Sequence, residues 1–228
     1  MRDILHENTD HTSIRLTEDG SHTLYVSGID ECYHSSHGAI QESKHIFIEA
    51  ALNNCKKTEL TVFEVGFGTG LNAFLTCLEA ERRGLKVHYI CIEKYPVPIE
   101  NVERLNFPAV LCPEKQNVFM QMHCSAWNEK IPLSDTFGLL KIKGDFTSYL
   151  HTDKYDVVYF DAFSPDKQPE MWSDIQFGKI FEACNPGAVL TTYCAKGVVR
   201  RTMQSTGFSV ERLPGPPGKR EMLRAIKE

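Results

Sequence analysis

The sequence predicts an α/β fold with a doubly wound, mostly parallel sheet of seven strands. From Leu60 onward, short apolar runs alternate with longer segments of helical periodicity, and this alternation is typical of parallel strands joined by helices. A glycine-rich segment also joins the first apolar run to the first helical segment, as in sheets that bind ligands beyond the ends of their strands. The last two apolar runs are separated by a short Pro/Gly segment, so we expect a C-terminal antiparallel hairpin.

A smaller extension precedes this pattern. Ile14–Thr17 and Thr23–Val26 are β-like runs around a Glu-Asp-Gly-Ser turn, which indicates a hairpin, and Ile40–Leu52 has helical periodicity. We expect residues 1–58 to form a lid of hairpin and helix within one domain, and residues 59–228 to form the main α/β domain.

The main domain is expected to contain seven strands and five helices. The predicted strands are 60–65, 86–92, 139–142, 155–160, 187–193, 208–213 and 222–226. The predicted helices are 71–83, 99–105, 114–127, 171–184 and 196–205. Gly84 and Gly207 follow two of the helices, where a glycine ends a helix readily.

Composition excludes several classes of protein. The apolar runs are far shorter than the 18 or so residues of a membrane span, and Met1–Asp10 lacks the apolar region of a signal peptide. None of the eight cysteines has the spacing of a zinc site, so we expect no metal. Reduced thiols and a cytoplasmic location are the simplest interpretation, and no obligate protein partner is evident.

The charge is unevenly distributed. The net charge of −5 hides a segment, residues 191–228, with 8 Lys/Arg against 3 Asp/Glu, whereas residues 1–190 hold 17 against 27. A basic segment can bind phosphates, although it can also be a solvated helix face with surface ion pairs. The overall acidity therefore does not exclude a nucleic-acid partner.

The glycine segment Gly66-Phe67-Gly68-Thr69-Gly70 is the first candidate binding element. Glycines there let the backbone approach a ligand, and the following helix offers free N–H donors. A dinucleotide fingerprint, GxGxxG, would need glycine at position 71, which is Leu71, and this disfavours an NAD-type oxidoreductase. Taken alone, the segment could also be a tight turn.

Carboxylates stand at the ends of four predicted strands. Glu64, Glu93, Asp145 and Asp161 each have a simpler explanation by themselves, as a solvated strand end, a turn cap or a helix N-cap. Their joint occurrence at one edge of a parallel sheet favours a binding site for a cation or for ligand hydroxyl groups.

This combination resembles the S-adenosylmethionine-dependent methyltransferases with a Rossmann-like sheet. The resemblance implies that Glu64 and the glycine loop hold the methionine moiety, that Glu93 accepts hydrogen bonds from the ribose, and that Asp145 binds adenine beside Phe146. The implied cofactor-binding residues are Glu64, Gly66, Phe67, Gly68, Gly70, Asn72, Glu93, Lys94, Asp145 and Phe146.

Asp161 is the candidate catalytic residue. Asp161-Ala-Phe-Ser-Pro165 resembles the Asp/Asn-Pro-Pro-aromatic loop with which amine methyltransferases hold a nitrogen. Methylation needs a free lone pair on the nitrogen, and a carboxylate can bind an alkylammonium, take its proton and orient it. A strand-end aspartate that only caps a turn is the alternative.

Longer motifs resemble the methyltransferase part of the bifunctional tRNA 5-methylaminomethyl-2-thiouridine biosynthesis proteins. They are the stretch from Asp161 to Trp172, Pro-Gly-Lys-Arg-Glu-Met222, and Tyr33-His-Ser-Ser-His-Gly-Ala-Ile-Gln-Glu42. The resemblance implies methyl transfer to the primary amine of 5-aminomethyl-2-thiouridine at the tRNA wobble position, with the anticodon stem-loop bound by the C-terminal basic segment. The implied substrate-binding residues are Tyr33, Glu42, Phe163, Ser164, Pro165, Met171, Trp172, Lys196, Lys219, Arg220 and Glu221.

Two departures from that family qualify the resemblance. The sequence ends at Glu228, soon after the last predicted strand, so we expect a stand-alone methyltransferase without the FAD-dependent oxidase half and without FAD. Gln41 replaces a glutamate that the family commonly has before Glu42, which weakens the expected contact of the lid.

Three other functions remain open, and the first is methyl transfer to another amine substrate. A polyamine synthase also places an aspartate after an apolar strand to hold an amine, although the basic Lys219-Arg220 pair disfavours it. A non-catalytic cofactor-binding or RNA-binding module is the third alternative, and the intact Asp161 loop argues against it.

Overall fold

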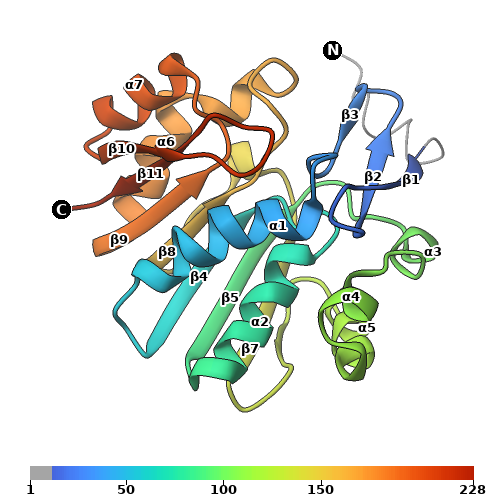
Figure 1. Ribbon diagram of the computed structural model, residues 1–228. Helices are drawn as coiled ribbons and strands as arrows, with labels where there is room; N and C mark the ends of the chain where they lie inside the picture. The colour runs from blue at the N-terminus through green and yellow to red at the C-terminus, as the bar shows by residue number, and fades with distance from the viewer. Residues whose placement is uncertain (1–11) are drawn as a thin grey trace.

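The computed structural model describes residues 12–228 (Figure 1). Residues 1–11, which include the segment Met1–Asp10 and the start of the predicted 1–58 extension, lie outside this range. The main sheet has eight strands in the order β10-β11-β9-β8-β4-β5-β7-β6. Its strands are β4 (Glu59–Val65), β5 (Lys86–Glu93), β6 (Lys130–Pro132), β7 (Phe137–Lys143), β8 (Tyr155–Phe160), β9 (Cys184–Thr192), β10 (Ser209–Pro214) and β11 (Glu221–Ile226).

The doubly wound, mostly parallel sheet is confirmed. β4 pairs in parallel with β5 on one side and with β8 on the other, while β10 and β11 form the predicted antiparallel hairpin. The predicted number of strands, seven, is wrong, because β6 pairs antiparallel with β7 at the sheet edge. Its three residues, of which one is Pro132, are too few to show a strand period in the sequence.

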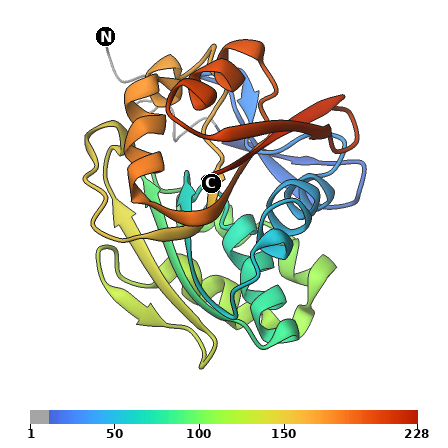
Figure 2. The same ribbon diagram turned by 90° about the vertical axis from the view of Figure 1, so that its left-hand side faces the viewer.

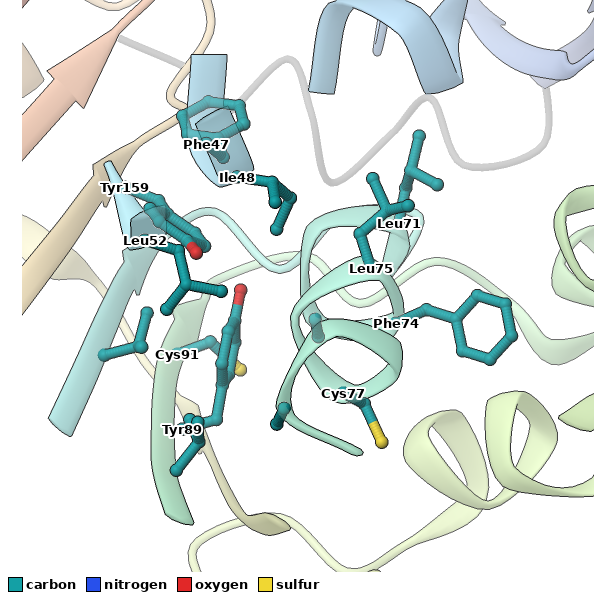
Figure 3. Close-up of a cluster of buried hydrophobic side chains, with 14 of the residues drawn as sticks. Phe47, Ile48, Leu52, Leu71, Phe74, Leu75, Cys77, Tyr89, Cys91 and Tyr159 are labelled. Carbon is teal, nitrogen blue, oxygen red and sulfur yellow. The ribbon is translucent and has the colours of Figure 1, made fainter. Parts of the chain in front are cut away.

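Helices cover both faces of the sheet (Figures 1 and 2). The α-helices are α1 (Ala39–Ser43), α2 (Leu71–Arg83), α3 (Ile99–Val102), α4 (Phe107–Leu111), α5 (Gln116–Cys124), α6 (Asp174–Ala183) and α7 (Gly197–Ser205). Neighbouring strand residues contribute to opposite cores, because side chains alternate along a strand. Val62 lies in the core under α2 and Phe63 in the core under α6 and α7. Figure 3 shows the first of these cores around Tyr89 and Tyr159.

Several predicted helices differ in detail. The single helix expected over 40–52 is a short α1, a π-helical segment Lys44–Glu49 and a 3₁₀ turn Leu52–Asn54. Ile46, Phe47 and Ile48 are consecutive and all buried, whereas a regular amphipathic α-helix buries one stripe. Figure 3 shows Phe47 and Ile48 directed at the core.

The other helix corrections concern boundaries. The predicted helix 114–127 ends at Cys124, the helix 99–105 ends at Val102, and α4 follows it unpredicted. The helix expected from Met171 begins at Asp174, because a 3₁₀ turn, Pro169–Trp172, precedes it. Boundaries of this kind depend on tertiary packing more than on local propensity.

The lid is a three-stranded antiparallel sheet followed by α1. Its strands are β1 (Thr12–Leu16), β2 (His22–Val26) and β3 (Glu31–Cys32), and the third strand was not predicted. The segment that follows α1 contacts the end of β10, since His45 Nε2 lies 2.9 Å from the carbonyl oxygen of Pro214. Lid and C-terminal hairpin therefore meet above the same end of the sheet (Figure 1).

Within residues 12–228, no helix is long and apolar enough to cross a bilayer. The same residues contain no group of three His, Cys, Asp or Glu side chains that could hold a metal ion.

Candidate active site

A cavity of about 870 Å³ lies at the carboxyl ends of β4, β5, β7 and β8, beneath the lid. β8 follows β7 in the chain but lies on the other side of β4, so the strand order reverses here, as at ligand sites in open α/β sheets. The predicted site residues that line it are Tyr33, Glu42, Gly66, Phe67, Gly68, Asn72, Glu93, Lys94, Asp145, Phe146, Asp161, Phe163, Met171 and Lys219.

The glycine loop has a conformation that side chains rarely adopt. Gly66 has a φ of 90°, and a Cβ there would lie 2.9 Å from the carbonyl oxygen of Asp161. Gly68 has a φ of 47°, and a Cβ there would lie 2.9 Å from the ring of Tyr33. Both positions need glycine, and the loop presents bare backbone to the cavity. Gly70 is not in the cavity wall and instead precedes α2 as its N-cap.

Glu93 ties the loop to the end of β5. Its carboxylate accepts hydrogen bonds from the backbone N–H of Gly68 at 3.0 Å and of Tyr95 at 2.8 Å. Burial raises the pKa of Glu93, although these backbone N–H groups partly oppose the shift. Each carboxylate oxygen can accept a further bond from a ligand hydroxyl.

Asn72 joins two carboxylates. Its side-chain amide nitrogen donates to Glu64 Oε1 at 2.9 Å and to Asp161 Oδ2 at 2.8 Å. Glu64 is 1% exposed and does not line the cavity, so it acts on the site through Asn72. Burial raises the pKa of Glu64 well above its ordinary value.

Asp161 lies directly beside the glycine loop. β8 runs parallel to β4 in a register that pairs Phe160 with Val65, and the N–H of Asp161 donates to the Val65 carbonyl at 3.1 Å. Burial and the charge of Glu42 raise the pKa of Asp161 to about 7, against the opposing effects of Asn72 and Lys219. A carboxyl group with such a pKa can exchange a proton near neutral pH.

Asp145 caps a turn and also lines the cavity. Its Oδ1 accepts bonds from the backbone N–H and the hydroxyl of Thr147, and its Oδ2 lies 3.3 Å from Lys94 Nζ. Burial raises its pKa, but these bonds and the Lys94 charge bring the pKa below its ordinary value. The capping role therefore coexists with a place beside Phe146 in the cavity wall.

A salt bridge between the lid and the C-terminal hairpin forms another part of the cavity wall. Lys219 Nζ pairs with Glu42 Oε1 and lies 4.4 Å from the ring centroid of Tyr193. The other oxygen of Glu42 accepts the backbone N–H of Ser35 at 2.8 Å. Tyr33 packs edge-on against Phe163, with ring centroids 5.2 Å apart. Lid, C-terminal hairpin and the Asp161 loop thus meet around one pocket.

Four residues with possible functions were missed: Tyr193, Glu31, Arg15 and Lys167 all line the cavity. Tyr193 follows β9, so the strand-end argument that found Asp161 could have found it. No signal in the sequence identified the other three, because they come from the lid and from a loop.

Several predicted residues lie outside the cavity wall. Trp172 is 5% exposed, packs against Phe160 at 4.7 Å and donates its indole N–H to the Phe163 carbonyl, so it belongs to the core that supports Phe163. Lys196 pairs with Asp166, and Glu221 pairs with Arg212. Ser164, Pro165 and Arg220 are likewise not among the residues that line the cavity.

The residues present fit S-adenosylmethionine. The glycine cradle admits no Cβ, Glu93 offers acceptors to a ribose, and the carboxylates suit a sulfonium cation. Fold and site together define a Rossmann-like enzyme that binds a nucleoside cofactor over a glycine loop. A family model of S-adenosyl-L-methionine-dependent methyltransferases matches residues 91–228. The chain belongs to this methyltransferase family.

Comparisons with individual proteins point in the same direction. The chain is 33% identical to the tRNA 5-methylaminomethyl-2-thiouridine biosynthesis bifunctional protein MnmC of Cupriavidus metallidurans, over 92% of this chain and 33% of that protein. It is 28% identical to the MnmC of Leptospira borgpetersenii, over 85% of this chain and 32% of that protein. The chain thus spans about a third of the length of these curated relatives.

Solved structures confirm the fold. The crystal structure of MNMC2 from Aquifex aeolicus matches with a TM-score of 0.73 and 25% identity, over 95% of this chain and 70% of that one. Spermidine synthase from Thermotoga maritima matches with a TM-score of 0.62 and 11% identity, over 94% of this chain and 68% of that one. The second likeness shows a shared fold alone.

Proposed function

We propose that this methyltransferase transfers a methyl group from S-adenosylmethionine to the primary amine of 5-aminomethyl-2-thiouridine at the tRNA wobble position. The product would be 5-methylaminomethyl-2-thiouridine. The observation that carries the proposal is the carboxylate of Asp161, which lies beside the glycine loop in the cavity. The curated relatives of the chain are named for this modification. The proposal covers methyl transfer only, with neither an FAD-dependent step nor a metal.

The cofactor would lie along the ends of β4, β5 and β7. We assign the methionine moiety to Gly66, Phe67, Gly68 and Asn72, with Glu64 holding Asn72 in place. Glu93 and Lys94 would hold the ribose, and Asp145 and Phe146 the adenine. Gly70 acts indirectly in this proposal, by beginning α2 behind the loop. When bound, the cofactor supplies an electrophilic methyl group.

Asp161 would receive the substrate amine as an ammonium ion. Because its pKa is about 7, a large share of Asp161 is ionised at neutral pH and can both bind the ammonium and accept a proton at Oδ1. The bond from Asn72 fixes the Oδ2 side of the carboxylate. Proton transfer to Oδ1 leaves the nitrogen with the lone pair that it needs for attack.

The pocket beyond Asp161 would hold the uridine. Phe163, Met171 and Tyr33 offer apolar surface for an unstacked base, and single-stranded bases are commonly recognised by stacking on such rings. Ser164, Pro165 and Trp172 would shape this wall from behind. Glu42 and Lys219 would close it as a salt bridge.

The C-terminal segment would contact the anticodon stem-loop through the cations that remain available. Lys196, Arg212 and Arg224 are engaged with Asp166, Glu221 and Glu211. Arg200, Arg201 and Arg220 make no salt bridge within the described part of the chain. We assign the phosphate contacts to these three residues, and a cytoplasmic location follows from the tRNA substrate.

The test is transfer of a labelled methyl group in vitro. The protein is incubated with labelled S-adenosylmethionine and either tRNA carrying the 5-aminomethyl group or matched tRNA lacking the amine. A parallel reaction supplies decarboxylated S-adenosylmethionine and putrescine, the substrates of a polyamine synthase. We expect label only in the aminomethyl tRNA. Cofactor binding without incorporation into that tRNA would refute the substrate, and aminopropyl transfer to putrescine in the parallel reaction would favour the polyamine alternative.

A further inference from the structure

Two cations of the cavity wall are not used by the proposed cofactor or amine sites. Arg15 comes from β1 of the lid, and Lys167 comes from the loop that follows β8. Both side chains are exposed, and neither makes a salt bridge within residues 12–228. The part of the wall that they share with Ile29, Glu31 and Cys32 holds none of the residues proposed for the cofactor.

Arg15 is held over an aromatic ring. Its guanidinium carbon lies 3.5 Å from the ring centroid of Tyr25, and the Tyr25 hydroxyl donates to Asp30 Oδ1 at 2.7 Å. Tyr25 lies on one side of the guanidinium, and the Arg15 side chain stays exposed to the cavity rim. A guanidinium in this arrangement can stack on a base and donate to a phosphate.

Lys167 has a fixed backbone. Its N–H donates to the Ser164 carbonyl at 2.8 Å, in the turn that also places Phe163 in the pocket. Glu31 is the neighbouring carboxylate; it is half-buried, and burial raises its pKa despite Ser164 and the charge of Lys167. The rim thus carries two exposed cations, Arg15 and Lys167, beside the carboxylates of Glu31 and Glu170, and the two cations are the groups suited to an anionic strand.

We propose that Arg15, stacked on Tyr25, together with Lys167, binds the nucleotides that flank the modified uridine in a single-stranded RNA loop. Arg15 stacks on one base and donates to a phosphate, and Lys167 binds a second phosphate. This inference rests on the proposed function, because a base inserted in the pocket must bring its neighbours to the rim. The lid would thus provide a second RNA contact site in addition to the C-terminal cations.

The test measures the affinity of the protein for a labelled anticodon stem-loop over a range of salt concentrations. Arg15→Ala and Lys167→Ala should each weaken binding by roughly fivefold or more and reduce the salt slope by about one. Arg15→Lys should keep the salt slope but still lose affinity, because lysine has no planar group to stack. Arg82→Ala, which removes an exposed cation paired with Glu79 on α2, is the matched control and should change neither value.

The outcomes separate this inference from the proposed function. Unchanged affinity and salt slope in both alanine variants would overturn the rim site even if methyl transfer occurs. If binding weakens as expected but no RNA is methylated, the rim site stands and the proposed reaction fails. A wild-type protein that does not bind the stem-loop would overturn the rim site. Binding of S-adenosylmethionine should be unaltered in every variant, which excludes a general loss of folding.

Discussion

The carboxylates at the strand ends and the cations of the C-terminal segment behave differently. Glu93 and Asp161 are held by backbone N–H groups and by Asn72, inside the cavity that the sheet defines. Lys196 and Arg224 instead pair with carboxylates on the surface. A charge at the end of a parallel strand has its place set by the sheet, whereas a charge on a surface helix or hairpin takes whichever partner lies near it.

The largest effect is expected from Asp161, the carboxylate of this comparison that lies beside the glycine loop in the cavity. Asp161→Ala should lower kcat by roughly 10³-fold, because it removes both the amine-binding carboxylate and the proton acceptor. Binding of S-adenosylmethionine, measured by calorimetry, should be retained. Asp166→Ala in the same loop removes an exposed carboxylate that pairs with Lys196 and should leave kcat within about twofold. Equal losses in the two variants would contradict the role of Asp161.

A smaller but clear effect is expected from the glycine cradle. Gly66→Ala places a Cβ against the Asp161 carbonyl, so the loop must shift and cofactor affinity should fall by about tenfold or more. Gly84→Ala is the matched control, since its φ is also positive, at +66°, but no atom lies within 4 Å of the new Cβ. It should cost about 1 kcal/mol of stability and leave affinity unchanged. Calorimetry and thermal unfolding measure the two quantities, and a similar loss of affinity in both variants would argue against a cofactor cradle.

Replacing either member of the Glu42–Lys219 salt bridge should shift the pH dependence of kcat/KM, and the two replacements should shift it in opposite directions. Activity needs ionised Asp161, so kcat/KM should fall as the pH drops through about 7. Lys219 lowers the pKa of Asp161 and Glu42 raises it, so Lys219→Met should move this acid limb to higher pH and Glu42→Gln to lower pH. Each shift should be about half a unit to one unit. Shifts of the same sign would contradict the assignment of the limb to Asp161.

The smallest effects are expected on the surface. Arg220→Ala removes a cation that makes no salt bridge in the described part of the chain and should reduce the salt slope of tRNA binding by about one. Arg224→Ala removes a cation already paired with Glu211, so its slope should change less. Filter binding at several salt concentrations measures both slopes. A larger change of the salt slope for Arg224→Ala than for Arg220→Ala would contradict the expectation that Arg220 contributes more.

The sequence predicted those parts of the fold that repeat a strong local pattern. Buried strands such as 155–160 and the loop from Gly66 to Gly70 carry their own signals, and the parallel sheet then brings Glu93 and Asp161 together. β6 is three residues long and gives no such signal. The π-helical segment depends on packing of Ile46, Phe47 and Ile48 against the sheet, which no local propensity encodes.

The candidate site was predictable to a similar extent. Asn72 bridges Glu64, eight positions before it in the chain, and Asp161, 89 positions after it. Only the folded sheet brings these three side chains together. Lys219 was expected to bind the substrate tRNA but pairs with Glu42, which lies 177 positions earlier. Trp172 was expected to bind the substrate, although its low exposure places it in the core. Long-range pairings of this kind are absent from the local sequence.

We propose that the chain methylates an aminomethyl uridine at the wobble position of tRNA. The most direct measurement is mass spectrometry of wobble nucleosides in tRNA from cells that lack the protein, with and without its return on a plasmid. We predict that 5-aminomethyl-2-thiouridine accumulates, that 5-methylaminomethyl-2-thiouridine is lost, and that the wild-type chain restores it whereas Asp161→Ala does not. An unchanged nucleoside profile in the cells that lack the protein would contradict the account.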